Sequence, residues 1–268
     1  MSQTYRTFFG FSRDPFSSEL KIEEILQTEA VVAVANRVDY AIRLGAIALI
    51  TGEVGSGKST ALRFALSRLH PSEYRLLWVT AGGGSVLELY RQITWELEVE
   101  TTSTRAASTR IIRKSILDLV LGKKQKAVLI IDEASLLRLE VFAELHTLTQ
   151  FEGDSKPILP MILAGQNNLL DKLYWRTSLP LSSRVVTRSH LEGVDRQGMQ
   201  DYLNHHLRLA GLTHSIFSDQ AITAIHQGSG GLFRKANHLA RGALIAAADE
   251  KCQQVSAEHV RLASTELI

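Results

Sequence analysis

Residues 52–60 have the sequence Gly-Glu-Val-Gly-Ser-Gly-Lys-Ser-Thr, a spacing of glycine, lysine and serine that binds the phosphates of a nucleotide. The segment follows the apolar run 46–50 and precedes an amphipathic stretch, so we expect a strand, a tight loop and a helix. That arrangement directs backbone N–H groups and a helix N-terminus at one small volume, where an anion is stabilised. A chance glycine-rich turn would not require this flanking pattern.

Each position of this loop has an expected role. Gly52, Gly55 and Gly57 allow the tight turn and the close approach of a phosphate. Lys58 is expected to reach the β- and γ-phosphates, and the Ser59 hydroxyl is expected to bind Mg²⁺, so ATP and Mg²⁺ are the predicted ligands. The nucleotide-binding prediction covers the whole loop and also includes Glu53, Val54, Ser56 and Thr60.

A pair of acids follows the apolar run 127–131, which has the pattern of a buried parallel strand. Asp132 comes at the carboxyl end of that strand, where a second ligand for Mg²⁺ is needed, and Glu133 is the next residue. Two adjacent carboxylates can divide the work, because one holds the metal while the other polarises an attacking water. We predict this division, with Glu133 as the base, against the alternative of two solvated acids.

Short apolar runs alternate with longer helical patterns over residues 28–191, which predicts a parallel sheet with crossover helices. The expected strands are 46–51, 75–80, 127–132, 158–164 and 184–191. From residue 195 the pattern is helical alone, and the expected helices are 195–210, 218–228, 232–250 and 256–267. The predicted class is α/β, with a nucleotide-binding domain over 1–192 and a small helical domain over 193–268.

The composition is that of an ordinary globular protein, with 268 residues of which 45% are apolar and a net charge of +2. Its one cysteine, Cys252, excludes an internal disulfide and favours a reducing compartment, so a cytoplasmic location is expected. The sequence has no run of eighteen apolar residues and no basic flank with a hydrophobic stretch at its start. Neither a membrane span nor a signal peptide is predicted.

Several further motifs narrow the class. They are Phe9-Gly10-Phe11, Asp14-Pro15-Phe16, the run 132–135, Leu163-Ala164-Gly165-Gln166, the run 181–185, and Gly231 to Asn237. Together with the loop at 52–59 they resemble the ExeA-type branch of the AAA+ ATPases, from about residue 5 onward. The resemblance implies a P-loop sheet sandwiched by helices and followed by a helical lid domain, Mg²⁺-dependent ATP hydrolysis, and side-by-side assembly of copies in a ring or a helical filament.

The resemblance also assigns roles to single residues. Gln166 matches sensor 1, the polar group that contacts the γ-phosphate, and an amide that follows the apolar run 158–164 would lie at the same sheet edge as Asp132. Arg184 matches the arginine finger that reaches the ATP of a neighbouring copy, with Arg176 and Arg188 as rivals. A surface amide is the alternative for Gln166.

One motif departs from the family pattern, and another has two possible roles. Arg234 matches sensor 2 on the helical domain, but Phe233 stands where the family usually has proline, so this helix start is in question. The equivalents of Phe9, Phe11 and Phe16 line the adenine pocket in relatives. For each of these three aromatics we favour a place in the core.

Residues 101–126 contain seven lysines and arginines and a single acid, Asp118, which gives this segment a net charge of +6. Such a segment is a candidate for contacts with DNA phosphates, and a solvated charged face is the equal alternative. Repetition of weak contacts in an oligomer would add avidity. The proposed nucleic-acid contacts are Arg105, Arg110, Arg113 and Lys114.

The branch includes secretion-pathway ATPases and the TnsC- and TniB-like regulators of DNA transposition. The secretion relatives carry a membrane anchor and a wall-binding domain after the ATPase, and this sequence ends at Ile268 with neither. We therefore expect a homo-oligomer that binds double-stranded DNA and recruits a transposase. The alternatives are a secretion-pathway ATPase for membrane-complex assembly and an AAA+ switch of another pathway; Glu133 and Arg234 disfavour a small-molecule kinase.

Overall fold

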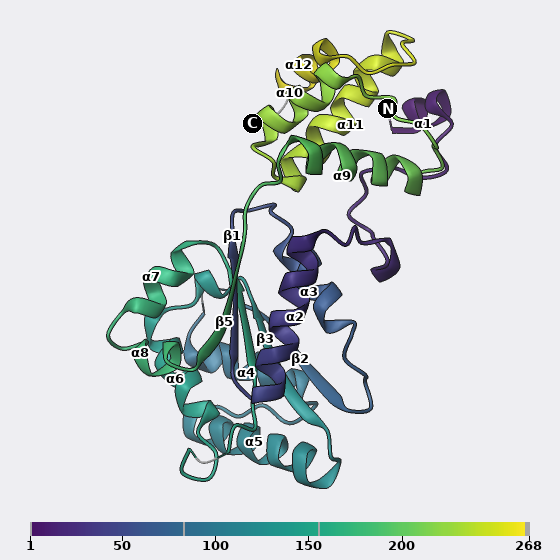
Figure 1. The fold of residues 1–268 in the computed structure, drawn as a ribbon. Helices are drawn as coiled ribbons and strands as arrows, with labels where there is room; N and C mark the ends of the chain where they lie inside the picture. The colour runs from purple at the N-terminus through teal and green to yellow at the C-terminus, as the bar shows by residue number, and fades with distance from the viewer. Residues whose placement is uncertain (1, 83, 155, 266–268) are drawn as a thin grey trace. The chain divides into compact units, whose positions relative to one another are not determined.

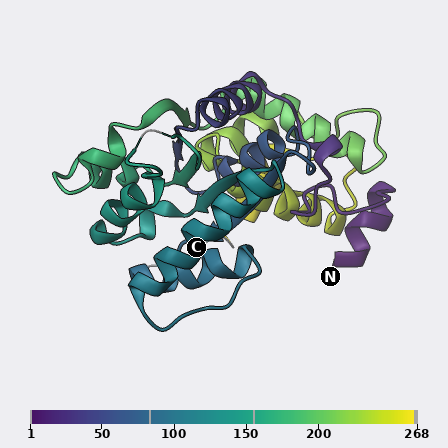
Figure 2. The same ribbon diagram turned by 90° about the horizontal axis from the view of Figure 1, so that it is seen from below.

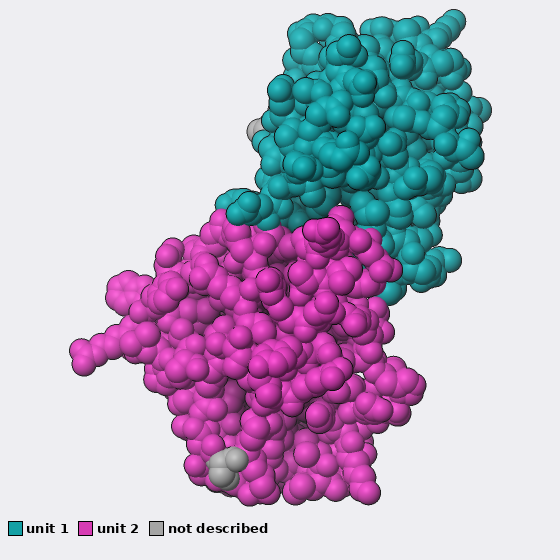
Figure 3. Space-filling model, in the orientation of Figure 1, with its two compact units in different colours: residues 1–26, 53–57, 192–268 teal, residues 27–52, 58–191 magenta. Residues whose placement is uncertain are grey.

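The computed structural model describes residues 2–82, 84–154 and 156–265 (Figure 1). The described residues form two compact units (Figure 3). The sheet unit contains residues 27–52 and 58–191, and the helical unit contains the described residues of 1–26, 53–57 and 192–268. The loop at 53–57 therefore clusters with the helical unit, although both chain segments that flank it belong to the sheet unit.

The sheet unit is built on five parallel strands in the order β2-β3-β4-β1-β5. The strands are β1 (Ile47–Gly52), β2 (Tyr74–Thr80), β3 (Lys126–Asp132), β4 (Met161–Gly165) and β5 (Val185–Leu191). This confirms the predicted parallel sheet. The start of β4 was predicted at residue 158 and lies at Met161, because Pro160 has no N–H to donate to a neighbouring strand.

Helices cover both faces of this sheet, as predicted (Figure 1). On β3, Val128 and Ile130 pack against α2 (Glu29–Leu44) and α3 (Lys58–Leu66). Leu129 and Ile131 face the other way, because alternate side chains of a strand lie on opposite faces. The helices on that second face are α4 (Val86–Glu96), α5 (Arg105–Leu117), α6 (Leu139–Thr149), α7 (Asn168–Tyr174) and α8 (Leu179–Ser182). Burial on both faces explains the continuous apolar runs of the sequence.

Short helical turns complete the connections. The 3-10 turn η1 (Ile22–Glu24) precedes α2, and the π-type turn η2 (Asp118–Gly122) extends α5. The 3-10 turn η3 (Ala134–Leu136) follows Glu133 directly. Among the longer helices, α4 and α5 lie side by side (Figure 2).

The helical unit packs its helices around its own apolar core. They are α1 (Ser2–Phe9), α9 (Arg196–Leu209), α10 (Asp219–Ser229), α11 (Phe233–Asp249) and α12 (Ala257–Thr265). α9, α10 and α11 begin and end within one residue of the predicted bounds, and α12 begins within one residue. The predicted end of the last helix, at residue 267, lies outside the described residues. Ser218 is the N-cap of α10, since its side chain accepts a hydrogen bond from the Ala221 N–H at 3.1 Å.

The aromatic residues near the N-terminus belong to this core. Phe9, Phe11 and Phe16 are each at most 7% exposed and pack in the same cluster as α9–α12. Asp14 fixes the segment, because its Oδ1 accepts from the Phe16 N–H at 2.9 Å and its Oδ2 pairs with Arg241 at 3.1 Å. The structure thus supports the core interpretation of these aromatics.

A buried acid ties three helices of the sheet unit together. Glu144 on α6 is 5% exposed and accepts hydrogen bonds from the Tyr90 hydroxyl on α4 and from Arg105 on α5. Burial alone would raise the pKa of Glu144, but the hydrogen bonds from Arg105 and Tyr90 outweigh it and hold that pKa below its usual range. A lowered folded-state pKa stabilises the fold above the ordinary value of 4.5, and that stabilisation is lost as the pH falls further.

Replacing Arg105 with alanine tests this network. We expect Arg105→Ala to lower the free energy of unfolding by about 1–3 kcal/mol at pH 7, because a buried carboxylate loses a charged donor. Urea denaturation measures the change, with the exposed Arg110→Ala on the same helix as control at less than about 0.5 kcal/mol. Equal effects of the two substitutions would contradict a structural role for Arg105.

Candidate nucleotide-binding site

The strand that leads into the predicted phosphate loop and the strand that carries the predicted acids end at one edge of the sheet. Strands β1, β3 and β4 are parallel, so their carboxyl ends at Gly52, Asp132 and Gly165 lie at the same edge. β4 lies between β3 and β1 in the sheet, which puts the end of its strand between the other two. Ligands of open parallel sheets bind at this edge.

The loop after β1 has the backbone that its glycines predict. Gly55 and Gly57 have φ angles of +85° and +93°, in the left-handed region that favours glycine. The Lys58 side chain is 7% exposed, and its Nζ donates to the Gly52 carbonyl at 3.0 Å across the loop. Ser56 Oγ is buried and has no hydrogen-bond partner in the described residues, so a phosphate oxygen would satisfy it.

The remaining loop positions differ in exposure. Glu53 and Val54 are exposed at the tip of the loop, and Thr60 lies in the first turn of α3 and is half-buried. Their proposed role in nucleotide binding stays a prediction.

Two oxygen ligands suited to Mg²⁺ lie together beside this loop. The Ser59 hydroxyl donates to Asp132 Oδ2 at 3.0 Å, which joins the start of α3 to the end of β3. A hydroxyl and a carboxylate are hard oxygen donors, the chemistry that Mg²⁺ prefers. The residues present therefore fit the metal, and Ser59 and Asp132 are the side chains that would hold it.

Glu133, the residue after Asp132, has an unusual backbone conformation. Its φ of 53° and ψ of 31° lie in the left-handed region, which is uncommon for a residue with a side chain. Its N–H donates to Asp132 Oδ1 at 2.9 Å, and its carbonyl accepts from the Leu136 N–H at 2.8 Å. Strained non-glycine residues of this kind cluster at functional sites.

Gln166 follows β4 and lies next to the turn that carries Glu133. A Cβ added at Gly165 would lie 2.8 Å from the Ser135 backbone nitrogen, so only glycine allows these two segments to touch. Gln166 is half-buried, and its carbonyl accepts from the Leu169 N–H at 3.0 Å. The arrangement brings Gln166 to the same edge as Asp132, where it was predicted to act.

Arg234 contacts the phosphate loop within the helical unit. Its backbone N–H donates to the Gly55 carbonyl at 3.3 Å, and a Cβ added at Gly55 would lie 2.7 Å from the Arg234 Cβ. Phe233 begins α11, and its ring packs on Tyr202 with centroids 4.4 Å apart. Tyr202 also donates to Asn237 Oδ1 at 2.9 Å, so Phe233 and Asn237 hold α11 against α9.

Arg184 lies at the opposite edge of the sheet, where the strands begin. Its carbonyl accepts from the Ile47 N–H at 3.0 Å, at the start of β1, whereas the phosphate loop leaves the end of that strand. Its guanidinium pairs with Asp154 and donates through Nε to His146 Nδ1 at 3.2 Å. The hydrogen bond from Arg184 lowers the pKa of Asp154, and burial together with Arg184 lowers the pKa of His146. Neither of these partners of Arg184 was predicted from the sequence.

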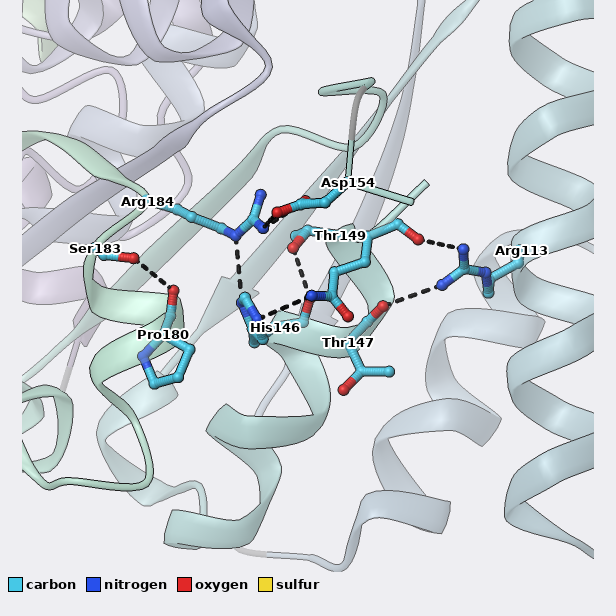
Figure 4. Close-up of polar contacts among 9 residues, drawn as sticks. Arg113, His146, Thr147, Thr149, Asp154, Pro180, Ser183 and Arg184 are labelled. Carbon is cyan, nitrogen blue, oxygen red and sulfur yellow. Dashed lines mark hydrogen bonds and ion pairs between the residues drawn. The ribbon is translucent and has the colours of Figure 1, made fainter. Parts of the chain in front are cut away.

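The four predicted DNA contacts lie on α5, and two of them have partners within the chain. Arg105 pairs with the buried Glu144. Arg113 donates to the Thr147 carbonyl at 3.1 Å and to the Gln150 carbonyl (Figure 4). Its guanidinium also lies 4.8 Å from the centroid of the Phe151 ring. Both therefore support α6 and the residues after it. Arg110 and Lys114 are exposed.

The sheet order, the phosphate loop and the Ser59–Asp132 pair define a P-loop protein with the AAA+ fold. Residues 42–173 match the family described as an AAA domain. The chain is 30% identical over 267 residues to the general secretion pathway protein A of Aeromonas hydrophila. That match covers 98% of this chain and 48% of the relative, so the chain spans about half of the relative's length.

Solved structures share the fold. Cdc6p from Pyrobaculum aerophilum superimposes with a TM-score of 0.76 at 15% identity, over 96% of this chain and 72% of that chain. The RuvB Holliday junction branch migration motor of Thermotoga maritima gives 0.62 at 18% identity, over 95% of this chain and 74% of that chain. These likenesses show the AAA+ fold. None of the helices in the described residues is long and apolar enough to cross a membrane.

A methyl group at Gly55 tests the loop geometry. We expect Gly55→Ala to weaken binding of a fluorescent ATP analogue at least about tenfold, because a left-handed alanine costs about 1–3 kcal/mol and its Cβ crowds Arg234. Gly82→Ala is the control, since its Cβ would have no atom within 4 Å. Unchanged affinity in a folded Gly55→Ala protein would contradict the site.

Proposed function

We propose that this chain is an ATPase whose active site is completed by a second copy, so that ATP gates its assembly. The observation that supports this most directly is the separation of Arg184 from the phosphate loop. β1 has six residues and separates the two by about 20 Å at about 3.3 Å per residue. An arginine side chain cannot cover that distance, so Arg184 would act on the ATP of a neighbour.

Each residue has a defined task in this hypothesis. Lys58 and the loop N–H groups bind the phosphates, and Mg²⁺, when bound by Ser59 and Asp132, offsets the charge of the β- and γ-phosphates. Glu133 accepts a proton as a water oxygen bonds to the γ-phosphorus and the bond to ADP breaks. Gln166 and Arg234 contact the phosphates from β4 and from the helical unit.

An exposed apolar surface supports contact between copies. Tyr174, Trp175 and Leu179 are 66%, 59% and 49% exposed and lie in the ten residues that precede Arg184. Exposed aromatic and aliphatic side chains that lie close together in this way are typical of protein interfaces. We propose that this surface packs on the neighbour that receives Arg184, in a ring or a helical filament.

The biological role that we propose is assembly of a secretion or membrane complex. It rests on the similarity to general secretion pathway protein A over nearly the whole chain. The transposition hypothesis, which the sequence favoured, relied in part on four cations for DNA contact, and two of them have partners inside the protein. The named relative thus fits the alternative from the sequence better than the main hypothesis.

Mixing two inactive variants tests the shared site. Arg184→Ala and Lys58→Ala should each hydrolyse ATP at least about 10³-fold more slowly than the wild type. An equimolar mixture should regain up to about a quarter of wild-type turnover, because one neighbour pair in four joins an intact Lys58 to an intact Arg184.

Arg188→Ala, on the exposed face of β5, is the control for this experiment and should retain turnover. A mixture as inactive as its parents, with both proteins folded and able to associate, would contradict action between copies. Full activity of Arg184→Ala alone would remove this residue from the mechanism.

A further inference from the structure

The backbone of Glu133 needs an external restraint. A left-handed conformation at a residue with a side chain costs about 1–3 kcal/mol and persists only where neighbouring groups impose it. The turn that follows is short: its hydrogen bonds run from the Leu136 N–H to the Glu133 carbonyl at 2.8 Å and from the Leu137 N–H to the Ala134 carbonyl at 3.2 Å. Two such bonds do not hold a strained residue in place by themselves.

A lysine from another helix binds this turn. Lys172 Nζ, on α7, donates to the Ser135 carbonyl at 2.6 Å and to the Leu137 carbonyl at 2.7 Å. Both bonds have a charged donor, which makes them stronger than bonds between neutral groups. Lys172 is half-buried, and its ammonium group donates to two carbonyls of the turn that follows Glu133.

The other side of the turn is closed by β4. Ser135 is 2% exposed, and a Cβ at Gly165 would lie 2.8 Å from its nitrogen and 3.1 Å from its Cβ. The turn therefore has no room to move toward β4, and Lys172 prevents it from moving away. Glu133 connects this restrained turn to Asp132 along the chain.

We propose that Lys172 is a positioning residue that fixes the carboxylate of Glu133 for the attack of water. The inference rests on the proposed role of Glu133 in ATP hydrolysis. Lys172 itself contacts neither the phosphate loop nor Asp132 in the described contacts, so it acts through the turn alone. Its loss should therefore slow turnover and leave the binding of ATP unchanged.

Lys172→Met keeps the aliphatic stem and removes the donor. We expect kcat to fall about 10- to 100-fold, the effect of displacing a reacting group by about 1 Å, while the Kd for ATP stays within about twofold. Lys172→Arg, which keeps charged donors, should restore most of the turnover. The exposed Lys123→Met is the matched control and should behave as the wild type.

A second readout needs no nucleotide. In the free protein, hydrogen–deuterium exchange at the amides of Leu136 and Leu137 should be faster in Lys172→Met than in the wild type, because these amides close the turn. Unchanged exchange at these amides would overturn the positioning role. Equal losses of ATP affinity and of turnover would also overturn it, because they indicate general misfolding of the site.

Glu133→Gln separates this inference from the proposed function. If Glu133→Gln abolishes turnover, adding Lys172→Met should cause no further loss, since both act on the same carboxylate. Full turnover of Lys172→Met beside an inactive Glu133→Gln would overturn the inference and leave the proposed function intact. Full turnover of Glu133→Gln would overturn the proposed role of Glu133 itself.

Discussion

The hydrogen bond from Ser59 to Asp132 is the constraint on which the rest of the site depends. It joins the start of α3, which follows β1, to the end of β3. The strands β1 and β3 are not neighbours, because β4 lies between them in the sheet. With strands about 4.8 Å apart, the loop and α3 must reach across the end of β4 to make it. Gln166, the residue that follows β4, therefore lies at the same sheet edge as Asp132.

The sheet also separates Arg184 from the strand ends that carry the site. Parallel strands have one edge where they end and one where they start, and Arg184 precedes β5 at the starting edge. In the single chain its charge is balanced by Asp154, and His146 accepts its Nε–H. In the proposed mechanism, the nucleotide bound to another copy replaces these partners of Arg184. The proposal of a second copy rests on the length of β1, which keeps Arg184 away from the phosphate-loop end of its own sheet.

The fold was largely predictable because its apolar runs are continuous and its glycines and N-caps mark where elements end. Much of the site was predictable for the same reason: a strand that ends in Asp132-Glu133 places both acids at the edge where β1 delivers the loop. The left-handed backbone of Glu133 and the contacts of Lys172 could not be predicted, because they depend on packing between segments some forty residues apart.

The charge run at 101–126 shows the limit of sequence reasoning in another way. A cluster of cations can serve a polyanion or pair with acids and carbonyls elsewhere in the chain, and composition does not distinguish the two. Arg105 finds Glu144, 39 positions away, and Arg113 finds the carbonyls that end α6. The opposite holds for Phe9, Phe11 and Phe16, whose hydrophobicity alone favoured the core that they occupy.

The mass of the protein in solution tests the central claim most directly. Mass photometry of Glu133→Gln, which is expected to bind ATP without cleaving it, should show the 29.7 kDa chain alone without nucleotide and multiples of that mass with ATP and Mg²⁺. Arg184→Ala in the same background should shift that equilibrium back toward the single chain. A protein that binds ATP and stays at 29.7 kDa at every concentration would contradict an active site shared between copies.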